Sequence, residues 1–215
     1  MDTKLVVADF EDWRETVDEA IALLEQGEVV ALPTETVYGL AADAFNAEAV
    51  AKVFEIKERP SFDPLIVHIG HKRDLEKVAM VPEELDELVD ELIEAYWPGP
   101  LTLVLPKRPE VPDIVTSGLD TVAVRISAHE VMRGVSRQMP VAAPSANRFG
   151  RISPTSAQAV IEELGGKIPL VIDGGACRDG VESTIVAPAM EEKGLVLRMM
   201  RPGPIPKEDL RKFAK

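Results

Sequence analysis

Short apolar runs alternate with helix-periodic stretches along this 215-residue chain, and that alternation constrains its fold more than any other feature. Strands are predicted by apolar runs at 28–33, 64–69, 101–105, 121–127, 140–143, 169–173, 183–187 and 195–200. Helices are predicted at 11–26, from Asn46 to Lys57, at 82–96, at 129–137, from Ser153-Pro154 to Gly165, and after Pro206. Interleaved strands and helices indicate an α/β protein with an open, twisted, mixed sheet flanked by helices. The sequence contains no internal repeat and no clear linker, so we expect a single domain over residues 1–215.

Composition excludes several classes of protein. Aromatic residues make up 5% of the chain, too few for a base-stacking surface built from many rings. Cys177 is the only cysteine, which excludes an internal disulfide and suits a reducing compartment. The three histidines and this cysteine lack zinc-type spacing, so we expect no metal held by the protein itself. The N-terminal residues do not resemble a secretory signal, and no apolar run approaches the roughly 18 residues of a membrane span. We therefore expect a cytoplasmic protein without a membrane segment.

Charge is distributed unevenly along the chain. The sequence has 24 Lys and Arg against 37 Asp and Glu, a net charge of −13. Residues 82–94 contain seven acids and no base, whereas residues 121–161 contain five arginines and one acid, Glu130. This sorting predicts a basic concave cleft in an acidic body, suited to a small polyanion such as a nucleoside triphosphate.

Two polar segments are candidates for binding that polyanion. Lys57 and Arg59, two residues apart at a helix end, are able to reach one anion from the same side, although solvated cations also favour a helix C-terminus. Ser145 and Asn147 follow an apolar strand, where ligands of open α/β sheets gather, although both are also ordinary turn residues. Spacing alone leaves both alternatives open.

Arg125 lies in the apolar segment 121–126 and needs an anionic partner, because an unpaired buried charge is strongly destabilising. A structural Asp or Glu would serve, and so would the carboxylate of a ligand. His68 in the strand at 64–69 is by itself more typical of a hydrogen-bonded filler than of a catalyst. Ser183 is also typical of the start of a strand, and Arg201 is also typical of a turn. The sequence contains neither GxGxxG nor a Walker motif.

In their joint order, the motifs are far more specific. PTETVYGL (33–40), KERPSFDPLIVHI (57–69), WPGPLTLVL (97–105), the strand at 121–126, APSANRFGRISPT (143–155), ESTIV (182–186) and RPGPIP (201–206) follow one another along the chain. In this order the chain resembles the YrdC-like family of threonylcarbamoyl-AMP synthases from about residue 15 to about residue 206. The resemblance implies a nucleotidyltransferase that forms L-threonylcarbamoyladenylate and pyrophosphate from L-threonine, bicarbonate and ATP. Longer members continue through a linker into a second domain, and this chain resembles the short, single-domain members.

The resemblance also implies a role for individual residues. The catalytic tetrad around the nucleotide falls on Lys57, Arg59, Ser145 and Asn147. Further ATP contacts fall on Asp63, Thr121, Ser153 and Arg201, although Asn is common in the family at the position of Asp63. L-threonine contacts fall on Thr34, His68, Arg125, the backbone of Ala143, and Ser183. Mg²⁺ would be held through the phosphates of ATP rather than by protein ligands.

The implied product serves the threonylcarbamoyladenosine modification of tRNA. We therefore expect the product to pass to a tRNA threonylcarbamoyl transferase, and we expect weak tRNA binding at most. Two alternatives are an RNA- or tRNA-binding module without catalysis and a relative that adenylates carbamoyl groups from carbamoyl phosphate. The net charge of −13 disfavours the first, because RNA affinity grows with the number of phosphates neutralised. The presence of Thr34, His68, Arg125 and Ser183 together disfavours the second.

Overall fold

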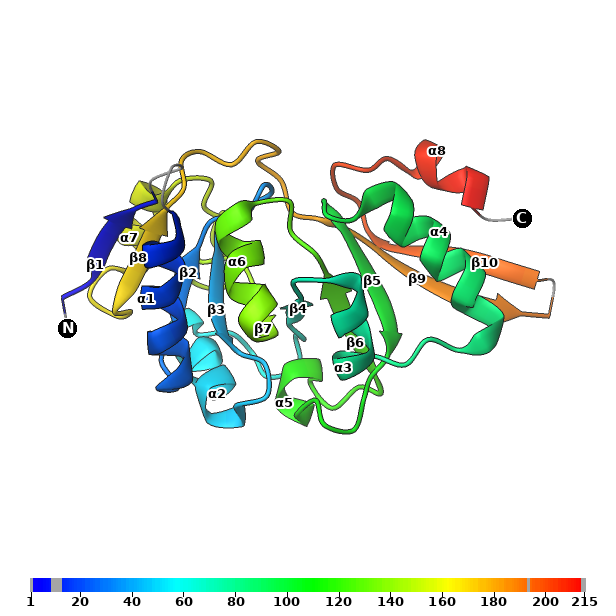
Figure 1. Ribbon diagram of the computed structural model, residues 1–215, viewed down its shortest axis with the longest axis horizontal. Coiled ribbons are helices and arrows are strands. Elements are labelled where there is room, and N and C mark those ends of the chain that lie inside the picture. The colour runs from blue at the N-terminus through cyan, green and yellow to red at the C-terminus, as the bar shows by residue number, and fades with distance from the viewer. Residues whose placement is uncertain (1, 9–12, 193, 214–215) are drawn as a thin grey trace.

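A mixed sheet runs the length of the molecule, with the two ends of the chain at opposite ends of it (Figure 1). The computed structural model describes residues 2–8, 13–192 and 194–213. Within these residues, ten strands are hydrogen-bonded in the order β1-β8-β2-β3-β7-β4-β6-β5-β9-β10. Their bounds are β1 Lys4–Val7, β2 Val30–Leu32, β3 Gly39–Asp43, β4 Ile66–His68, β5 Leu101–Pro106, β6 Thr121–Arg125, β7 Val141–Ala142, β8 Leu170–Asp173, β9 Thr184–Glu191 and β10 Gly194–Arg201. The pairs β1/β8, β2/β8, β4/β6 and β5/β9 are parallel and the others antiparallel, so the predicted mixed sheet is confirmed.

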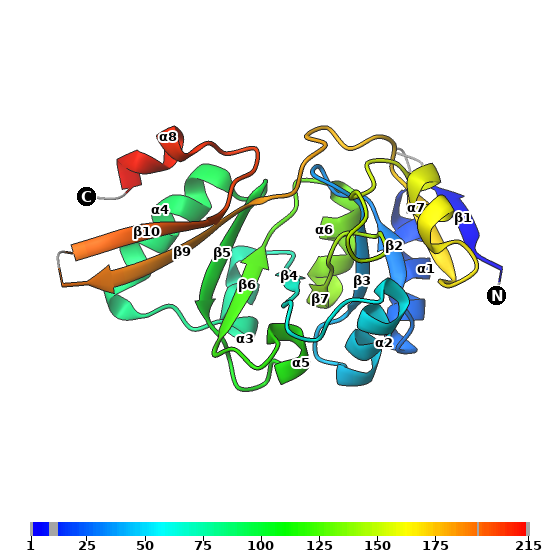
Figure 2. The same cartoon turned by 180° about the vertical axis from the view of Figure 1, so that it is seen from behind.

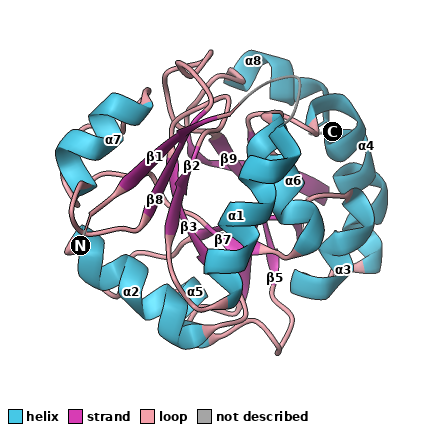
Figure 3. Ribbon diagram, turned by 60° about the vertical axis from the view of Figure 1, so that its left-hand side comes forward, coloured by secondary structure: helices cyan, strands magenta, loops and turns pink. Residues whose placement is uncertain are grey.

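Helices lie on both sides of the sheet. They are α1 Trp13–Glu25, α2 Ala47–Lys57, α3 Leu75–Val78, α4 Asp86–Tyr96, α5 Asp113–Thr116, α6 Glu130–Gln138, α7 Ala157–Leu164 and α8 Lys207–Leu210, with 3₁₀ turns at Lys72–Asp74, Glu83–Leu85 and Arg211–Phe213. Figure 3 shows the strands between one group of helices that includes α2 and α7 and another that includes α3 and α4. No helix in the described part of the chain has the length and apolarity needed to cross a bilayer.

Local sequence explains the helix that delivers the first candidate residues. The Asn46 side chain caps α2 by accepting hydrogen bonds from the backbone N–H groups of Glu48 and Ala49, both at 3.1 Å. Glu58 ends the helix in the left-handed conformation, with φ 54°. Because the helix stops there, Lys57 lies in its last turn and Arg59 in the loop that follows.

The β5–β6 part of the sheet has one covered and one open face. Leu103, Leu105, Val122 and Val124 are buried in the main hydrophobic core, which also contains the apolar side of α4. The alternate residues of the same strands point to the other face because side chains alternate across a strand. Figure 2 views the molecule from that face, with β4, β5, β6 and β9 in front of α3 and α4. This half-covered region of the sheet forms the base of the candidate site.

Three predictions from sequence were wrong at the local level. The strands β1 and β3 were not predicted. In β3, Gly39-Leu40-Ala41-Ala42-Asp43 lacks β-branched residues and is a strand only through its pairing with β2 and β7. The helix predicted from Ser153-Pro154 begins at Ala157, and Ser156 caps it. Pro154 instead accepts a hydrogen bond from the backbone N–H of Tyr38 at 2.9 Å. Residues 11 and 12 of the first predicted helix lie outside the described residues.

Candidate active site

All thirteen residues proposed from the sequence line one cavity of about 480 Å³. They are Thr34, Lys57, Arg59, Asp63, His68, Thr121, Arg125, Ala143, Ser145, Asn147, Ser153, Ser183 and Arg201. The structure therefore brings together segments that are far apart in the sequence. What each residue binds stays a prediction.

The floor of the cavity is the open face of the sheet. Thr121, Ala123 and Arg125 alternate along β6 and line the cavity, whereas Val122 and Val124 between them are buried in the core. Ile66 and His68 of β4 line it in the same way. A single strand pattern thus separates the residues that stabilise the fold from those available to a ligand.

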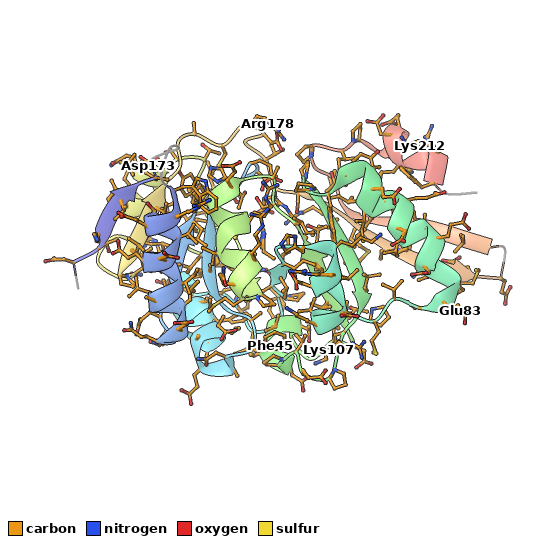
Figure 4. The ribbon with its side chains drawn as sticks, viewed as in Figure 1. Phe45, Glu83, Lys107, Asp173, Arg178 and Lys212 are labelled. Atoms are coloured by element: carbon orange, nitrogen blue, oxygen red, sulfur yellow. The ribbon has the colours of Figure 1, made fainter. Side chains whose placement is uncertain are left out.

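Loops form the walls. They are the segments 34–39, 57–65, 143–153 and the end of the long connection between β8 and β9. That connection crosses the molecule, with Arg178 exposed at its outer surface and labelled in Figure 4, and it brings Glu182 and Ser183 to the cavity.

Lys57 joins the two motifs that the sequence separates by almost ninety positions. Its Nζ donates hydrogen bonds to the carbonyl oxygens of Ser145 and Asn147, and the Phe149 backbone N–H donates to the Lys57 carbonyl at 2.7 Å. The residue is 1% exposed. This burial, with the nearby positive charge of Arg59, lowers the pKa of Lys57 to about 7.

Arg59 and Asp63 form an ion pair in the cavity wall. The Arg59 Nη2 to Asp63 Oδ2 distance is 2.9 Å, and Arg59 also donates to the carbonyl oxygens of Asp63 at 3.0 Å and Pro64 at 3.1 Å. Burial lowers the pKa of Arg59, while Asp63 opposes that shift. The carboxylate of Asp63 is therefore engaged by an arginine of the same site.

Arg201 is held by three groups. Its Nε donates to the Ser183 carbonyl and its Nη2 to the Ser183 hydroxyl, both at 3.0 Å, and its Nη1 donates to the carboxylate of Glu182. The Ser183 hydroxyl also pairs with that of Thr102 at 2.8 Å, and the Ser153 hydroxyl donates to Glu182 at 2.9 Å. Residues predicted to contact ATP and L-threonine are thus physically connected.

Arg125 has a protein counter-charge, which is one of the two alternatives that the sequence left open. Its Nη2 lies 2.8 Å from Oε1 of Glu35, and the two side chains are 3% and 5% exposed. Its Nη1 donates to the hydroxyl of Thr36 at 3.0 Å. The ionic contact is not aligned as a hydrogen bond, so Nε and Nη2 of Arg125 find no hydrogen-bond acceptor among the described residues. These two donors form one edge of the guanidinium, the edge that binds a carboxylate in bidentate fashion.

Two other buried polar groups in the cavity lack partners. Burial lowers the pKa of His68 to about 3, so its imidazole is neutral, and its Nδ1 has no hydrogen-bond partner within the described chain. The amide nitrogen of Asn147 donates to the carbonyls of Arg148 and Arg151 at 2.8 and 2.9 Å, but its Oδ1 is likewise unpartnered among the residues described. Buried polar atoms are normally satisfied, so these positions are suited to a ligand.

Other predicted contacts are already engaged within the protein. The Thr34 hydroxyl donates to the Val37 carbonyl at 2.6 Å and accepts from the backbone of Thr36 and Val37. The backbone N–H of Ala143 donates to the Ile66 carbonyl at 2.9 Å. These two residues shape the cavity through the turn and the sheet in which they lie.

Sequence reasoning missed Glu35, Thr36 and Glu182. Glu35 is an acid in an otherwise uncharged buried segment, residues 29–42, and a buried acid and a buried strand arginine are expected to pair. That signal was available for Glu35. Nothing in the sequence assigned Glu182 to Arg201, because the pairing depends on how β9 and β10 meet at the cavity.

The lining contains five Lys or Arg residues and two Asp or Glu residues. Three of the arginines, at positions 59, 125 and 201, are in contact with a carboxylate of the protein. The net basic character of the cavity stays a prediction.

Comparison with known proteins places the chain among relatives that share its sequence and fold. The family model Sua5_yciO_yrdC, described as "Telomere recombination", matches residues 22–200. A threonylcarbamoyl-AMP synthase of Pyrococcus abyssi is 47% identical over 204 residues, which cover 94% of this chain and 57% of the relative. A threonylcarbamoyl-AMP synthase of Bacillus subtilis is 43% identical over 217 residues, 98% of this chain and 61% of the relative. The crystal structure of P. abyssi Sua5 complexed with L-threonine superposes with a TM-score of 0.88 at 44% identity and covers 99% of this chain and 61% of that one.

Fold and site together define an open-sheet α/β protein with one polar cavity over the uncovered face of its sheet. The chain belongs to the Sua5/YciO/YrdC family. The predicted fold class is thereby confirmed. The chain spans about three fifths of the length of the relatives described above.

Proposed function

We propose that this chain is a threonylcarbamoyl-AMP synthase, a nucleotidyltransferase that forms L-threonylcarbamoyladenylate and pyrophosphate from L-threonine, bicarbonate and ATP. The observation that carries the proposal is that Arg125, with two donors on one edge that have no aligned hydrogen-bond acceptor among the described residues, lines the same cavity as Lys57 and Arg59. A carboxylate-binding group beside phosphate-binding groups suits an amino acid bound next to a nucleotide. The names of the relatives from P. abyssi and B. subtilis and the L-threonine complex of Sua5 support it further.

The threonine amine would attack carbon dioxide derived from bicarbonate to form a carbamate. A carbamate oxygen would then attack the α-phosphorus of ATP, and pyrophosphate would leave. Negative charge grows on phosphate oxygens in this second step, and Lys57, Arg59 and Arg201, which line the cavity, would offset it from fixed positions. No covalent nucleophile of the protein is required.

On the amino-acid side, Arg125 would hold the threonine carboxylate through Nε and Nη2. The neutral imidazole of His68 offers an unpartnered Nδ1 to the amine or hydroxyl of threonine without adding positive charge beside the amine. The amine is nucleophilic only without its extra proton, so a neutral neighbour favours the reactive form. Positioning of the two substrates therefore contributes more here than acid–base chemistry.

Mg²⁺ would be held through the phosphates of ATP, where it would neutralise charge on the triphosphate. The described residues contain no group of three or more His, Cys, Asp or Glu arranged to hold a metal. We further propose that the product passes in the cytoplasm to a tRNA threonylcarbamoyl transferase, with weak tRNA binding by this chain at most.

The test is pyrophosphate release from ATP in the presence of bicarbonate. Release should depend on L-threonine, and Lys57→Ala or Arg59→Ala should raise the barrier by about 2–4 kcal/mol, as expected for loss of a preorganised charge-stabilising group. Arg125→Ala should raise the KM for threonine more than the KM for ATP. Turnover that is indifferent to threonine, or equal effects of Arg125→Ala on both KM values, would contradict the assignment.

A further inference from the structure

The cavity contains two carboxylates among its cations, and the reaction steps proposed above use neither of them, although the family resemblance implies an ATP contact at Asp63. Asp63 is paired with Arg59 and Glu182 with Arg201. Their side chains are 38% and 35% exposed, so both carboxylates are accessible from the cavity. A bound polyphosphate would meet negative charge at the very groups proposed to hold it.

Glu182 has the more specific arrangement of the two. One of its oxygens accepts from Arg201 Nη1 and the other accepts from the Ser153 hydroxyl at 2.9 Å. Arg201 and Ser153 are two of the groups proposed to contact ATP. The carboxylate thus occupies donors that a phosphate group, with its own oxygens, would use in the same way.

The charge of Glu182 also acts on the rest of the cluster. Burial lowers the pKa of Lys57, Arg59 and Arg201, and the Glu182 carboxylate opposes that shift at each of the three. It therefore stabilises the protonated forms of these three cations as a group. A polyphosphate that replaced it would do the same with more charge.

We propose that Glu182 is a built-in competitor of the polyphosphate: its carboxylate binds Arg201 and Ser153, and phosphate oxygens displace it from them. The carboxylate lowers the affinity for every phosphate ligand and returns to Arg201 as pyrophosphate leaves, which favours release of that product. This inference rests on the proposed function, because it takes ATP and pyrophosphate as the ligands.

Arg201 does not depend on Glu182 for its position. Its Nε and Nη2 remain bound to the carbonyl and hydroxyl of Ser183, and Thr102 holds that hydroxyl from behind. Glu182→Gln keeps the size of the side chain and an oxygen that accepts from Ser153. The substitution therefore removes the competing charge and leaves the anion site in place.

The experiment is calorimetric titration of the full chain with inorganic pyrophosphate, in EDTA and again with excess Mg²⁺. Glu182→Gln should bind metal-free pyrophosphate about tenfold more tightly than the wild type, equivalent to about 1.4 kcal/mol. The matched control is Glu191→Gln. Glu191 of β9 pairs with Arg198 of β10 at an exposed position away from the cavity lining, so its substitution should leave the affinity unchanged.

Equal or weaker binding of metal-free pyrophosphate by Glu182→Gln would overturn the inference while leaving the proposed function standing. Weaker binding only in the presence of Mg²⁺ would also overturn it, because it would make Glu182 a metal ligand. If neither wild type nor variant binds pyrophosphate, the anion site itself is wrong and the proposed function fails with it. Glu182→Ala removes the same charge and repeats the measurement with a different side chain.

Discussion

The buried pair of Arg125 and Glu35 makes a quantitative prediction about stability. The charged groups are 2.8 Å apart, the side chains are 3% and 5% exposed, and Ser127 donates a hydrogen bond to the second carboxylate oxygen of Glu35. Glu35→Gln would leave the guanidinium buried without a counter-charge. Removing one partner of such a pair costs about 3–5 kcal/mol. For a chain of this length the melting temperature should fall by roughly 10 °C.

The assay is chemical and thermal denaturation near neutral pH. Glu19→Gln is the matched control, because Glu19 pairs with Lys4 at the surface, where the side chains are 36% and 60% exposed, and its loss should change stability by less than about 1 kcal/mol. Adding Arg125→Met to Glu35→Gln should recover part of the loss, because no unpaired charge then remains buried. Saturating L-threonine should stabilise Glu35→Gln more than the wild type, since the ligand carboxylate supplies the missing charge.

Lowering the pH independently tests whether ionised Glu35 stabilises the folded protein. Burial by itself raises the pKa of Glu35, but the charge of Arg125 and the hydrogen bond from Ser127 bring it below its ordinary value. The ionised carboxylate therefore contributes stability above the unfolded-state pKa of about 4.5, and this contribution is lost as pH falls through the lower folded-state pKa. The difference in unfolding free energy between the wild type and Glu35→Gln should narrow over that pH range. A gap below about 1 kcal/mol at neutral pH, or one that stays constant on acidification, would refute the reasoning.

Two further predictions concern the cavity. Because the pKa of Lys57 is lowered to about 7, its charge is lost as pH rises through that value, and the affinity for a non-hydrolysable ATP analogue should fall over the same range. Lys57→Arg keeps the charge and should bind with a flatter pH profile in calorimetric titration; identical profiles would contradict this. In Gly203→Ala, the new Cβ would lie against backbone atoms of Thr184 and Glu182. The displaced segment should lower stability by about 1–3 kcal/mol and raise the KM for threonine, as denaturation and steady-state kinetics would show.

Much of the fold could be predicted because its signals are local. The cap at Asn46 and the stop before Pro60 bounded α2 in the sequence, and they also located Lys57 and Arg59. The strand predicted at 64–69 contains β4, where side chains alternate so that Val67 lies in the core and His68 lines the cavity. The candidate residues were gathered by the order of their motifs rather than by any single spacing.

The rest depended on contacts between distant segments. β3 is a strand because β2 and β7 flank it, and its small residues gave no signal of their own. Ser153 looked like a helix cap, but its hydroxyl binds Glu182, and Ser156 caps the helix instead. The partner of Arg125 was left open because burial identifies a charge that needs a counter-ion without saying which acid supplies it.

Most cations of the cavity are paired with groups of the protein, and this pairing affects which ligand the cavity selects. Arg59, Arg125 and Arg201 each contact a carboxylate of the protein, and Lys57 donates to backbone carbonyls. Pairing of three arginines with carboxylates weakens the attraction that the cavity exerts at a distance, and the net charge of −13 further weakens attraction of a long polyanion. Nucleic acids bind proteins chiefly because many basic residues replace their counterions, so a surface with few unpaired cations contributes little binding free energy. A compact ligand that inserts several anionic oxygens at once is able to replace the carboxylates one by one, and that requirement favours a triphosphate beside an amino acid over RNA.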